Sequence, residues 1–141
     1  MRLFFARPLA SAGLILIGAT ACQTRVQPAP EPVVSTIFAR NFGAYDMSVF
    51  VVPENGQPVW LTNVPAGATR DIPLVARYLR PGNGVVVRAQ PLGGARSWTS
   101  GIAKLDEEVT GVLDLTTDRA GNPGGTLLRV VNTAVFESEM R

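Results

Sequence analysis

Residues 47–62 read MSVFVVPENGQPVWLT. Two runs rich in β-branched and aromatic residues, 47–52 and 58–62, stand on either side of the pair Asn55-Gly56. An Asn-Gly pair between such runs is the strongest short-range signal for a β-hairpin, because a two-residue type I′ turn needs positive φ at both central positions. The stretch therefore predicts two antiparallel strands joined by a tight turn.

The same texture of short β-rich runs and Gly- or Pro-containing turns continues on both sides of this hairpin. Only residues 74–80 have spacing compatible with a helix, and that segment is too short to be stable alone. Seven or eight short strands predict an all-β fold, a small antiparallel β-sandwich over residues 35–132. Besides the hairpin, the expected strands are 35–42, 68–72, 85–90, 96–99, 109–116 and 126–131.

The core of this sandwich is expected from apolar residues on the inward faces of the strands. Residues 109–116 alternate almost regularly, with the odd positions facing inward. A domain of this length can bury a core without disulfides. The expected core residues are Phe38, Val49, Val51, Leu61, Ile72, Val85, Val87, Ile102, Val109, Leu113, Leu115, Leu128 and Val130.

The chain of 141 residues contains no histidine and a single cysteine. A Ser/His/Asp triad, a Cys/His dyad and an imidazole-ligated zinc are thereby excluded. General acid–base chemistry would depend on carboxylates, Lys104 or tyrosines. We therefore expect no enzyme, no cofactor and no tightly bound metal. A hydrolase that uses Glu54 or Asp71 as its acid or base is the remaining catalytic alternative.

The N-terminus has the three parts of a secretory signal peptide, which we expect to span residues 1–21. Arg2 and Arg7 precede an uncharged run, and small residues follow at 19–21. The uncharged run from Leu9 to Ala21 has 13 residues. As a helix it would span about 20 Å, which is short of a hydrocarbon core about 30 Å thick. A permanent transmembrane helix is the weaker interpretation.

The junction Ala19-Thr20-Ala21-Cys22 resembles the lipobox of bacterial lipoproteins. The resemblance implies that Cys22 becomes a lipidated N-terminus, which would hold the domain on a membrane. The residue after the cysteine is Gln23. In lipoproteins of enteric type, Asp at this position resembles an inner-membrane retention mark. Gln23 therefore favours the outer membrane of the cell envelope. The alternative is ordinary cleavage after Ala21, because Ala19-Thr20-Ala21 also fits an A-x-A site, and Cys22 would then be a free thiol.

Residues 22–34 form a Pro-rich linker, which we expect to be an extended tether. A polyproline ligand for a partner groove is the alternative interpretation. Residues 133–141 are expected to be a C-terminal tail. Removal of Arg2 and Arg7 leaves eleven basic and eleven acidic residues, so the mature chain is neutral and nucleic acid is not an expected partner.

Three polar or glycine-rich patterns are candidate binding sites. Asp106-Glu107-Glu108 offers oxygen ligands for Ca²⁺, but adjacent carboxylates on an extended chain point to opposite sides, which favours a solvated turn. Asp114, Asp118 and Asn122 recur at every fourth residue and miss the spacing of a calcium loop. Residues 92–95, LGGA, lack the spacing of a phosphate-binding loop and are expected to form a hairpin loop.

Four aromatic residues are the candidates for a binding surface: Trp60, Trp98, Tyr45 and Tyr78. The alternative is that Trp60 and Trp98 cover the edge of the core. The strand layout resembles immunoglobulin-like and transthyretin-like sandwich modules. Two functions remain open, a noncatalytic envelope lipoprotein that binds a protein partner, and a carrier of a small ligand or glycan.

Overall fold

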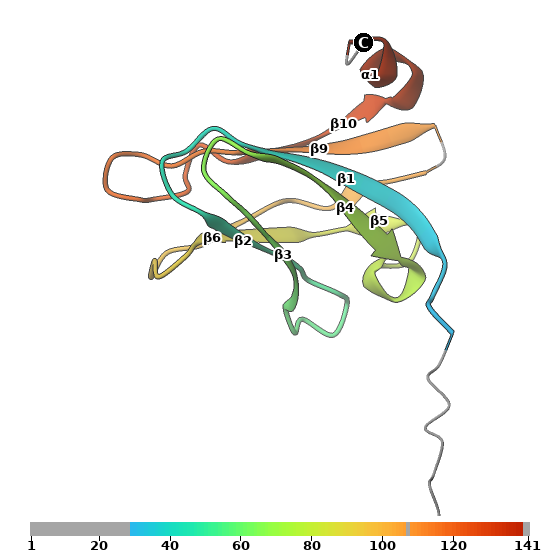
Figure 1. Ribbon diagram of the computed structural model, residues 1–141. Helices are drawn as coiled ribbons and strands as arrows, with labels where there is room; N and C mark the ends of the chain where they lie inside the picture. Colours follow the sequence, from blue (N-terminus) through green and yellow to red (C-terminus); the bar gives the residue numbers. More distant parts are fainter. Residues whose placement is uncertain (1–28, 107, 140–141) are drawn as a thin grey trace, which may run out of the picture.

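The computed structural model describes residues 29–106 and 108–139. Two four-stranded β-sheets pack face to face, which confirms the predicted all-β sandwich (Figure 1). The expected leader at 1–21, the lipidation site Cys22 and the linker up to residue 28 lie outside the described residues. Within the described residues, no helix is long and apolar enough to cross a membrane.

The first sheet has the strand order β10-β9-β1-β4. The pairs β1–β4 and β9–β10 are antiparallel, whereas β1 and β9 run parallel, with Ile37 opposite Gly111. The sheet is therefore mixed and departs from the purely antiparallel pairing that was expected. Its strands are β1 (Val33–Asn41), β4 (Thr69–Val75), β9 (Val109–Leu115) and β10 (Leu127–Asn132).

The second sheet has the order β3-β2-β6-β7, and a separate two-stranded ladder joins β5 and β8. β3 and β4 follow one another in the chain but belong to different sheets, so the turn between them crosses an edge of the sandwich. A short 3₁₀ helix, η1 (Ala76–Tyr78), follows β4. The remaining strands are β2 (Met47–Val51), β3 (Val59–Val64), β5 (Gly84–Val85), β6 (Val87–Pro91), β7 (Trp98–Thr99) and β8 (Ala103–Lys104).

The hairpin between β2 and β3 exists, but its turn is not the predicted type I′ turn. Gly56 has φ of 76°, whereas Asn55 is not among the residues with positive φ. The Gly56 N–H donates to the Pro53 carbonyl oxygen at 3.0 Å, and the connection spans residues 52–58. Pro53 and Pro58 lack the N–H groups that a ladder running up to the turn would need, which explains the longer loop.

The core lies between the two sheets and contains most of the expected residues. Val49, Val51, Ile72, Val85, Val87, Leu113 and Leu115 are buried, and Leu61 and Leu128 pack against them. Ile102 is 65% exposed, because it lies in the loop between the short strands β7 and β8 rather than on a strand. Val109 is only partly buried, and Val130 is exposed because β10 is an edge strand. The buried residues that were not expected include Ile37, Ala39, Met47, Val64, Leu74 and Leu105.

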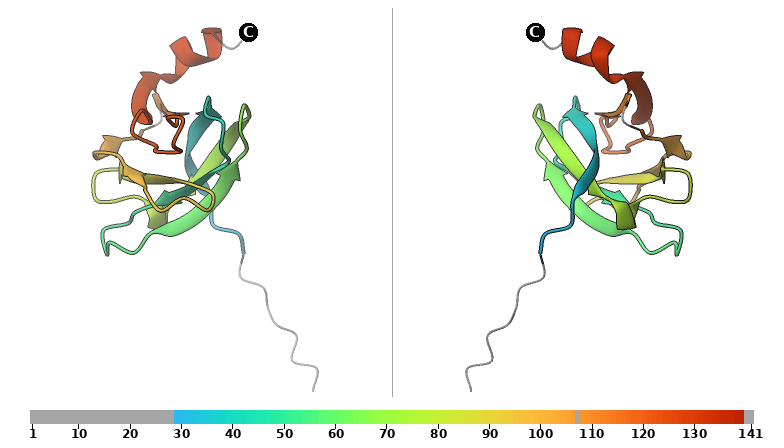
Figure 2. Two further views of the ribbon diagram at one scale, coloured as in Figure 1. Left: turned by 90° about the vertical axis from the view of Figure 1, so that its left-hand side faces the viewer. Right: turned by 90° about the vertical axis from the view of Figure 1, so that its right-hand side faces the viewer.

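Residues 133–139, expected as part of a tail, form the helix α1 (Thr133–Glu139). Phe38 alternates with the buried residues Ile37 and Ala39, so it points to the outer side of the first sheet instead of into the core. There it contacts Phe136 of α1. Figure 2 shows α1 beyond the layer formed by β10, β9, β1 and β4. This packing on the outer side accounts for the two adjacent apolar residues, Ile37 and Phe38, in β1.

Candidate functional site

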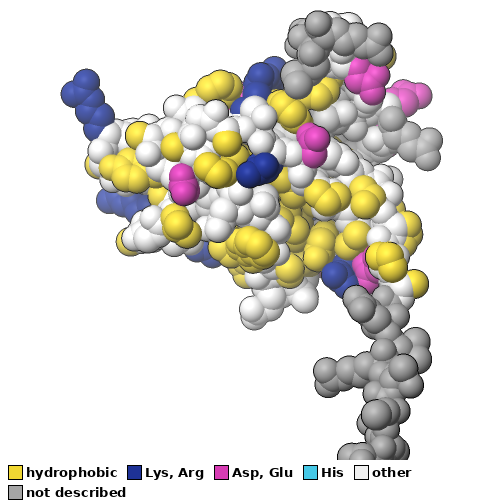
Figure 3. Space-filling view, viewed as in Figure 1, with side chains coloured by type: hydrophobic (Ala, Val, Ile, Leu, Met, Phe, Trp, Pro, Cys, Tyr) yellow, Lys and Arg dark blue, Asp and Glu magenta, His cyan; other side chains and the backbone are white. Residues whose placement is uncertain are grey.

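The candidate site is a groove of about 330 Å³ on the side of the sandwich where β3 and β4, the edge strands of the two sheets, face each other. We call it the β3/β4 groove. Figure 3 shows hydrophobic side chains gathered on this flank of the molecule. The groove is lined by Val33, Trp60, Leu61, Thr62, Asp71, Ile72, Pro73, Val75, Arg77 and Tyr78.

Two of the four predicted aromatic residues, Trp60 and Tyr78, meet in this groove. The other two do not. Trp98 is half-buried and packs against the core, as the alternative interpretation required. Tyr45 lies in the connection between β1 and β2, where its ring faces Gly121 of the β9–β10 loop; a Cβ added to Gly121 would be 3.5 Å from that ring.

A β-bulge in β3 determines where Trp60 lies. The register between β2 and β3 shifts so that Val49 faces Thr62 but Phe50 faces Trp60, which leaves Leu61 as the extra residue. Without the bulge, Trp60 would lie opposite Val51 on the core side of the sheet. A bulge changes the direction of a side chain in this way at the cost of one ladder pairing. Trp60 is accordingly 56% exposed, whereas Leu61 packs against the core.

The Trp60 side chain is held in place by polar contacts along β3. Its Nε1–H donates to the Asn63 Oδ1 at 3.2 Å, and the Ser48 hydroxyl donates to the same oxygen at 2.9 Å. Ser48 alternates with the buried residues Met47 and Val49, so these three groups meet on the outer side of the second sheet. The indole therefore presents an oriented aromatic surface at the rim of the groove.

The part of the groove that η1 forms is charged. The Arg77 guanidinium donates from Nη1 to Glu31 Oε1 at 2.8 Å and from Nη2 to the Tyr78 hydroxyl at 3.3 Å. The same guanidinium lies over the Tyr78 ring, 5.1 Å from its centroid. The hydrogen bond to Tyr78 and the charge of Glu31 raise the pKa of Arg77. Because Glu31 belongs to the linker, this ion pair connects the end of the linker to the groove.

Sequence patterns did not identify Asp71, Pro73 or Arg77 as groove residues. The sequence singled out Asp71 only as a possible acid or base, and Pro73 and Arg77 not at all. The crossing from β3 to β4 at the sandwich edge brings all three into the groove that Trp60 lines. Asp71 is the single carboxylate among the lining residues, and Glu54 lies elsewhere, in the β2–β3 connection. The two carboxylates of the hydrolase alternative are therefore not brought together in this groove.

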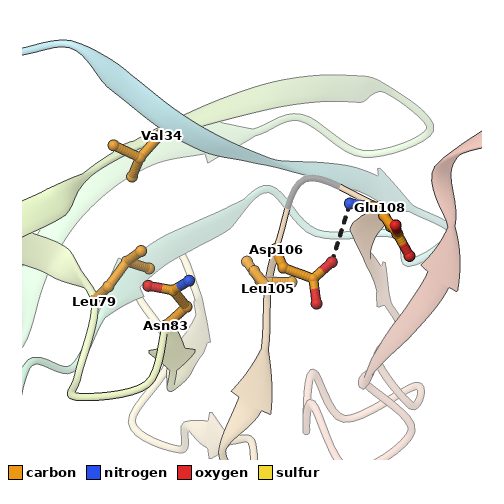
Figure 4. Close-up of a pocket in the computed structure, with 6 residues that line it drawn as sticks. All are labelled: Val34, Leu79, Asn83, Leu105, Asp106 and Glu108. Atoms are coloured by element: carbon orange, nitrogen blue, oxygen red, sulfur yellow. Dashed lines mark hydrogen bonds between the residues drawn. The ribbon is translucent and has the colours of Figure 1, made fainter.

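A larger depression of about 620 Å³ lies near the start of β1. Val34, Leu79, Asn83, Leu105, Asp106 and Glu108 line it (Figure 4). Asp106 Oδ1 accepts a hydrogen bond from the Glu108 N–H at 3.0 Å, so its carboxylate is engaged locally. The Glu108 side chain lies on the far side of Asp106 from Asn83 in Figure 4. Glu107 lies outside the described residues, so the solvated turn expected for residues 106–108 stays a prediction.

The second acidic pattern is divided between two separate contacts. Asp114 accepts hydrogen bonds from Arg40 Nε at 2.8 Å and Arg129 Nε at 3.2 Å on the outer side of the first sheet. Asp118 instead accepts bonds from the backbone N–H and the side-chain amide of Asn122, both at 2.8 Å. Among the described residues, no group of three His, Cys, Asp or Glu side chains is placed to hold a metal ion.

Comparison with known proteins does not assign this chain to a family. No family model matches it, and no curated protein matches it. Its fold is similar to the NMR structure of a protein from Eubacterium rectale, with a TM-score of 0.44 and 12% sequence identity over 71% of this chain and 88% of that chain. A likeness this distant carries no argument about function.

Proposed function

We propose that this chain is a noncatalytic lipoprotein of a bacterial cell envelope, anchored by lipid on Cys22, whose sandwich domain binds a protein partner through the β3/β4 groove. The anchor rests on the leader and on the lone cysteine at its end. Gln23 after the cysteine favours the outer membrane. The observation that carries the binding role is the half-exposed, oriented Trp60, which lines the same groove as Tyr78 and Arg77.

The groove suits a protein partner for two physical reasons. Exposed aromatic residues bury a large area at small entropic cost, and Trp, Tyr and Arg are the residue types that dominate binding energy at protein interfaces. All three types line this groove as Trp60, Tyr78 and Arg77. The groove also adjoins the linker, because Val33 lines it and Glu31 pairs with Arg77. A partner bound here would therefore lie close to the point where the domain joins its tether.

Affinity purification from membranes tests this proposal with two matched variants. W60A removes the groove aromatic, and L92A removes a side chain of similar exposure, 60%, in the β6–β7 loop outside the groove. We expect W60A to lose a partner that L92A and the wild type retain. The proposal also requires that the purified partner binds the purified wild-type protein. Equal recovery of the partner by W60A and L92A would contradict the role of the groove.

The anchor is tested separately by C22S. We expect the wild-type chain in the membrane fraction with a lipid-labelled N-terminus at residue 22, and C22S unprocessed or released. A soluble wild-type protein without label would instead support ordinary cleavage after Ala21, and it would leave the groove test unaffected.

Binding of a glycan at the same groove is the second candidate function. The observation in its favour is the mixture of one exposed indole with the polar groups of Asp71, Arg77 and Tyr78, because sugars present apolar C–H faces beside hydroxyl groups. Titration of the purified protein with envelope oligosaccharides, followed by tryptophan fluorescence, distinguishes the two functions. A saturable change that W60F preserves in part and W60A abolishes would favour the glycan.

A further inference from the structure

β10 is an edge strand whose outer side pairs with no strand in the described part of the chain. It pairs only with β9, from Leu127 opposite Asp114 to Asn132 opposite Val109. β8 packs near β10 without forming a ladder with it. The segment LLRVVN contains neither Pro nor Gly, and it exposes Leu127 and Val130. Long apolar edges of this kind are templates for pairing with another strand.

The other edges of the two sheets carry features that hinder strand addition. β4 contains Pro73, which has no N–H to donate. β3 is interrupted by the bulge at Leu61, and β7 has only two residues. Proline, a bulge and a short length are three of the devices by which proteins protect sheet edges, and β10 has none of these three. Its single charged residue is Arg129, whose guanidinium is paired with Asp114 of β9.

The register shows which backbone groups of β10 point outward. The Thr133 N–H donates to the Glu108 carbonyl oxygen at 2.8 Å, just beyond the pairing of Asn132 with Val109. In an antiparallel ladder, this bond makes Asn132 and Val109 a pair without mutual hydrogen bonds. Alternate residues therefore direct their N–H and C=O groups to the free edge. These residues are Leu128, Val130 and Asn132.

We infer that β10 pairs antiparallel with β10 of a second copy of this chain, about a twofold axis at Val130. Outward groups can bond to each other only if the axis passes through a residue of β10. An axis at Val130 pairs all three outward residues, whereas an axis at Arg129 or at Val131 pairs only two of them, and an axis at Arg129 also places two arginines opposite each other. Asp114 of each copy already accepts bonds from Arg40 and Arg129. It therefore has no further carboxylate oxygen to offset the charge of a second Arg129 beside the first. An axis at Val130 places two valines at the centre and Leu128 opposite Asn132 on both sides.

This register also covers apolar surface at the ends of the strand. Leu127 is 54% exposed, and it would lie opposite Thr133 of the second copy, where α1 begins. Val135 of α1 is likewise exposed. Pairing therefore joins the two first sheets into one and places the exposed Leu127 of each copy beside the start of α1 of the other.

Edge pairing by itself buries less area than a standard stable interface. Confinement on a membrane raises the effective concentration of the two copies, which favours a weak interface of this kind. In that respect the inference rests on the lipid anchor of the proposed function. It does not depend on the β3/β4 groove, which lies on different edge strands.

Cysteine cross-linking of the full chain in membranes tests the register. Two residues in a hydrogen-bonded antiparallel pair have Cα atoms about 5.5 Å apart, which suits a disulfide. V130C is therefore expected to form a covalent dimer under mild oxidation. N132C, at another outward position of the same strand, would be separated from its own mate by roughly 13 Å and is expected to stay monomeric.

A second pair of variants keeps the test independent of position 130. A chain carrying L128C and a second chain carrying N132C are produced together with different tags. These two chains are expected to cross-link to each other. The wild type shows any link through Cys22, and membrane fractionation of each variant shows separately whether the anchor holds. Folded, membrane-bound V130C that remains monomeric would overturn the inference, as would cross-linking of equal yield at N132C or a cross-link only to a different protein.

Discussion

Phe38 and Phe136 meet edge to face, with ring centroids 5.1 Å apart and planes inclined at 62°. Phe38 lies on the outer side of β1, and Phe136 is the residue of α1 that reaches it. Val112 of the neighbouring strand β9 is paired with Phe38 in the ladder and is 1% exposed, although it too faces outward. The sandwich therefore has a small apolar cluster on its outer side in addition to its core.

Removal of this contact is expected to destabilise the domain. Aromatic pairs contribute about 0.5–1.5 kcal/mol beyond the area that they bury. A double-mutant cycle of F38A and F136A, with unfolding free energies measured in urea, should give a coupling of about 1 kcal/mol. V135A, which truncates an exposed residue of the same helix, should change the free energy of unfolding little. Strict additivity of F38A and F136A would show that α1 does not pack as described.

Asn41, which is buried, connects three segments of the chain. Its side-chain amide donates to the carbonyl oxygens of Tyr45 and Val64, both at 2.9 Å, and its Oδ1 accepts from the Gly43 N–H at 2.9 Å. N41A removes the partner of the Val64 carbonyl, whose bond is buried, and of the partly buried Tyr45 carbonyl and Gly43 N–H, so we expect it to lower the free energy of unfolding by about 2–3 kcal/mol.

The control for N41A is N63A, because the Asn63 side chain is also hydrogen-bonded, with two bonds accepted by its Oδ1, but is exposed. Water can replace those partners, and a loss below about 1 kcal/mol is expected. Both variants are compared by urea denaturation. A loss for N41A no larger than that for N63A would contradict the role of burial.

The two tryptophans are expected to differ in their contribution to stability. Trp98 is half-buried against the core, whereas Trp60 is 56% exposed. W98A should lower the free energy of unfolding by about 2 kcal/mol, and W60A by less than about 1 kcal/mol, because less apolar surface is uncovered. Thermal unfolding followed by circular dichroism gives the order. The reverse order would mean that Trp60 belongs to the core and not to the groove.

Asp118 is expected to make the β9–β10 loop sensitive to acid. Hydrogen bonds from the Asn122 side chain, and then from the backbone N–H of Asn122, lower the pKa of Asp118 below its ordinary value of 3.8. A carboxylate with a depressed pKa stabilises the fold above that ordinary value, and the stabilisation is lost as the pH falls through the lowered pKa.

D118N tests this expectation, since the amide does not titrate. The difference in unfolding free energy between wild type and D118N should be constant near neutral pH and should shrink as the pH falls below 3.8. D71N, at an exposed carboxylate of β4, is the control. A difference that stayed the same in acid would show that the Asp118 bonds do not depend on its charge.

Strand positions were predictable from the sequence because they depend on local patterns. Alternation at 109–116 and the runs at 47–52 and 85–90 placed strands close to where β9, β2 and β6 occur. The glycine of the Asn55-Gly56 pair also marked a true turn, with positive φ at Gly56. Side-chain alternation and turn chemistry act over a few residues, so they are visible in one segment at a time.

The site was not predictable in the same way. The division of β3 and β4 between the two sheets decides which aromatic residues share a groove. It brings together Trp60 and Tyr78 but not Trp98 or Tyr45. The outward direction of Trp60 depends on a register shift against β2, and a shift of one residue moves a side chain to the other face of a sheet.

The amino-acid sequence was thus sufficient for the all-β class, the order of the main strands along the chain and half of the buried core cluster. The parallel pairing of β1 with β9, the docking of α1 on Phe38, the bulge at Leu61 and the free edge of β10 were settled only by the tertiary structure. The physical reason is the range of the interactions. Each of these features arises from contacts between segments far apart in the chain, and their energies depend on partners that no local pattern specifies.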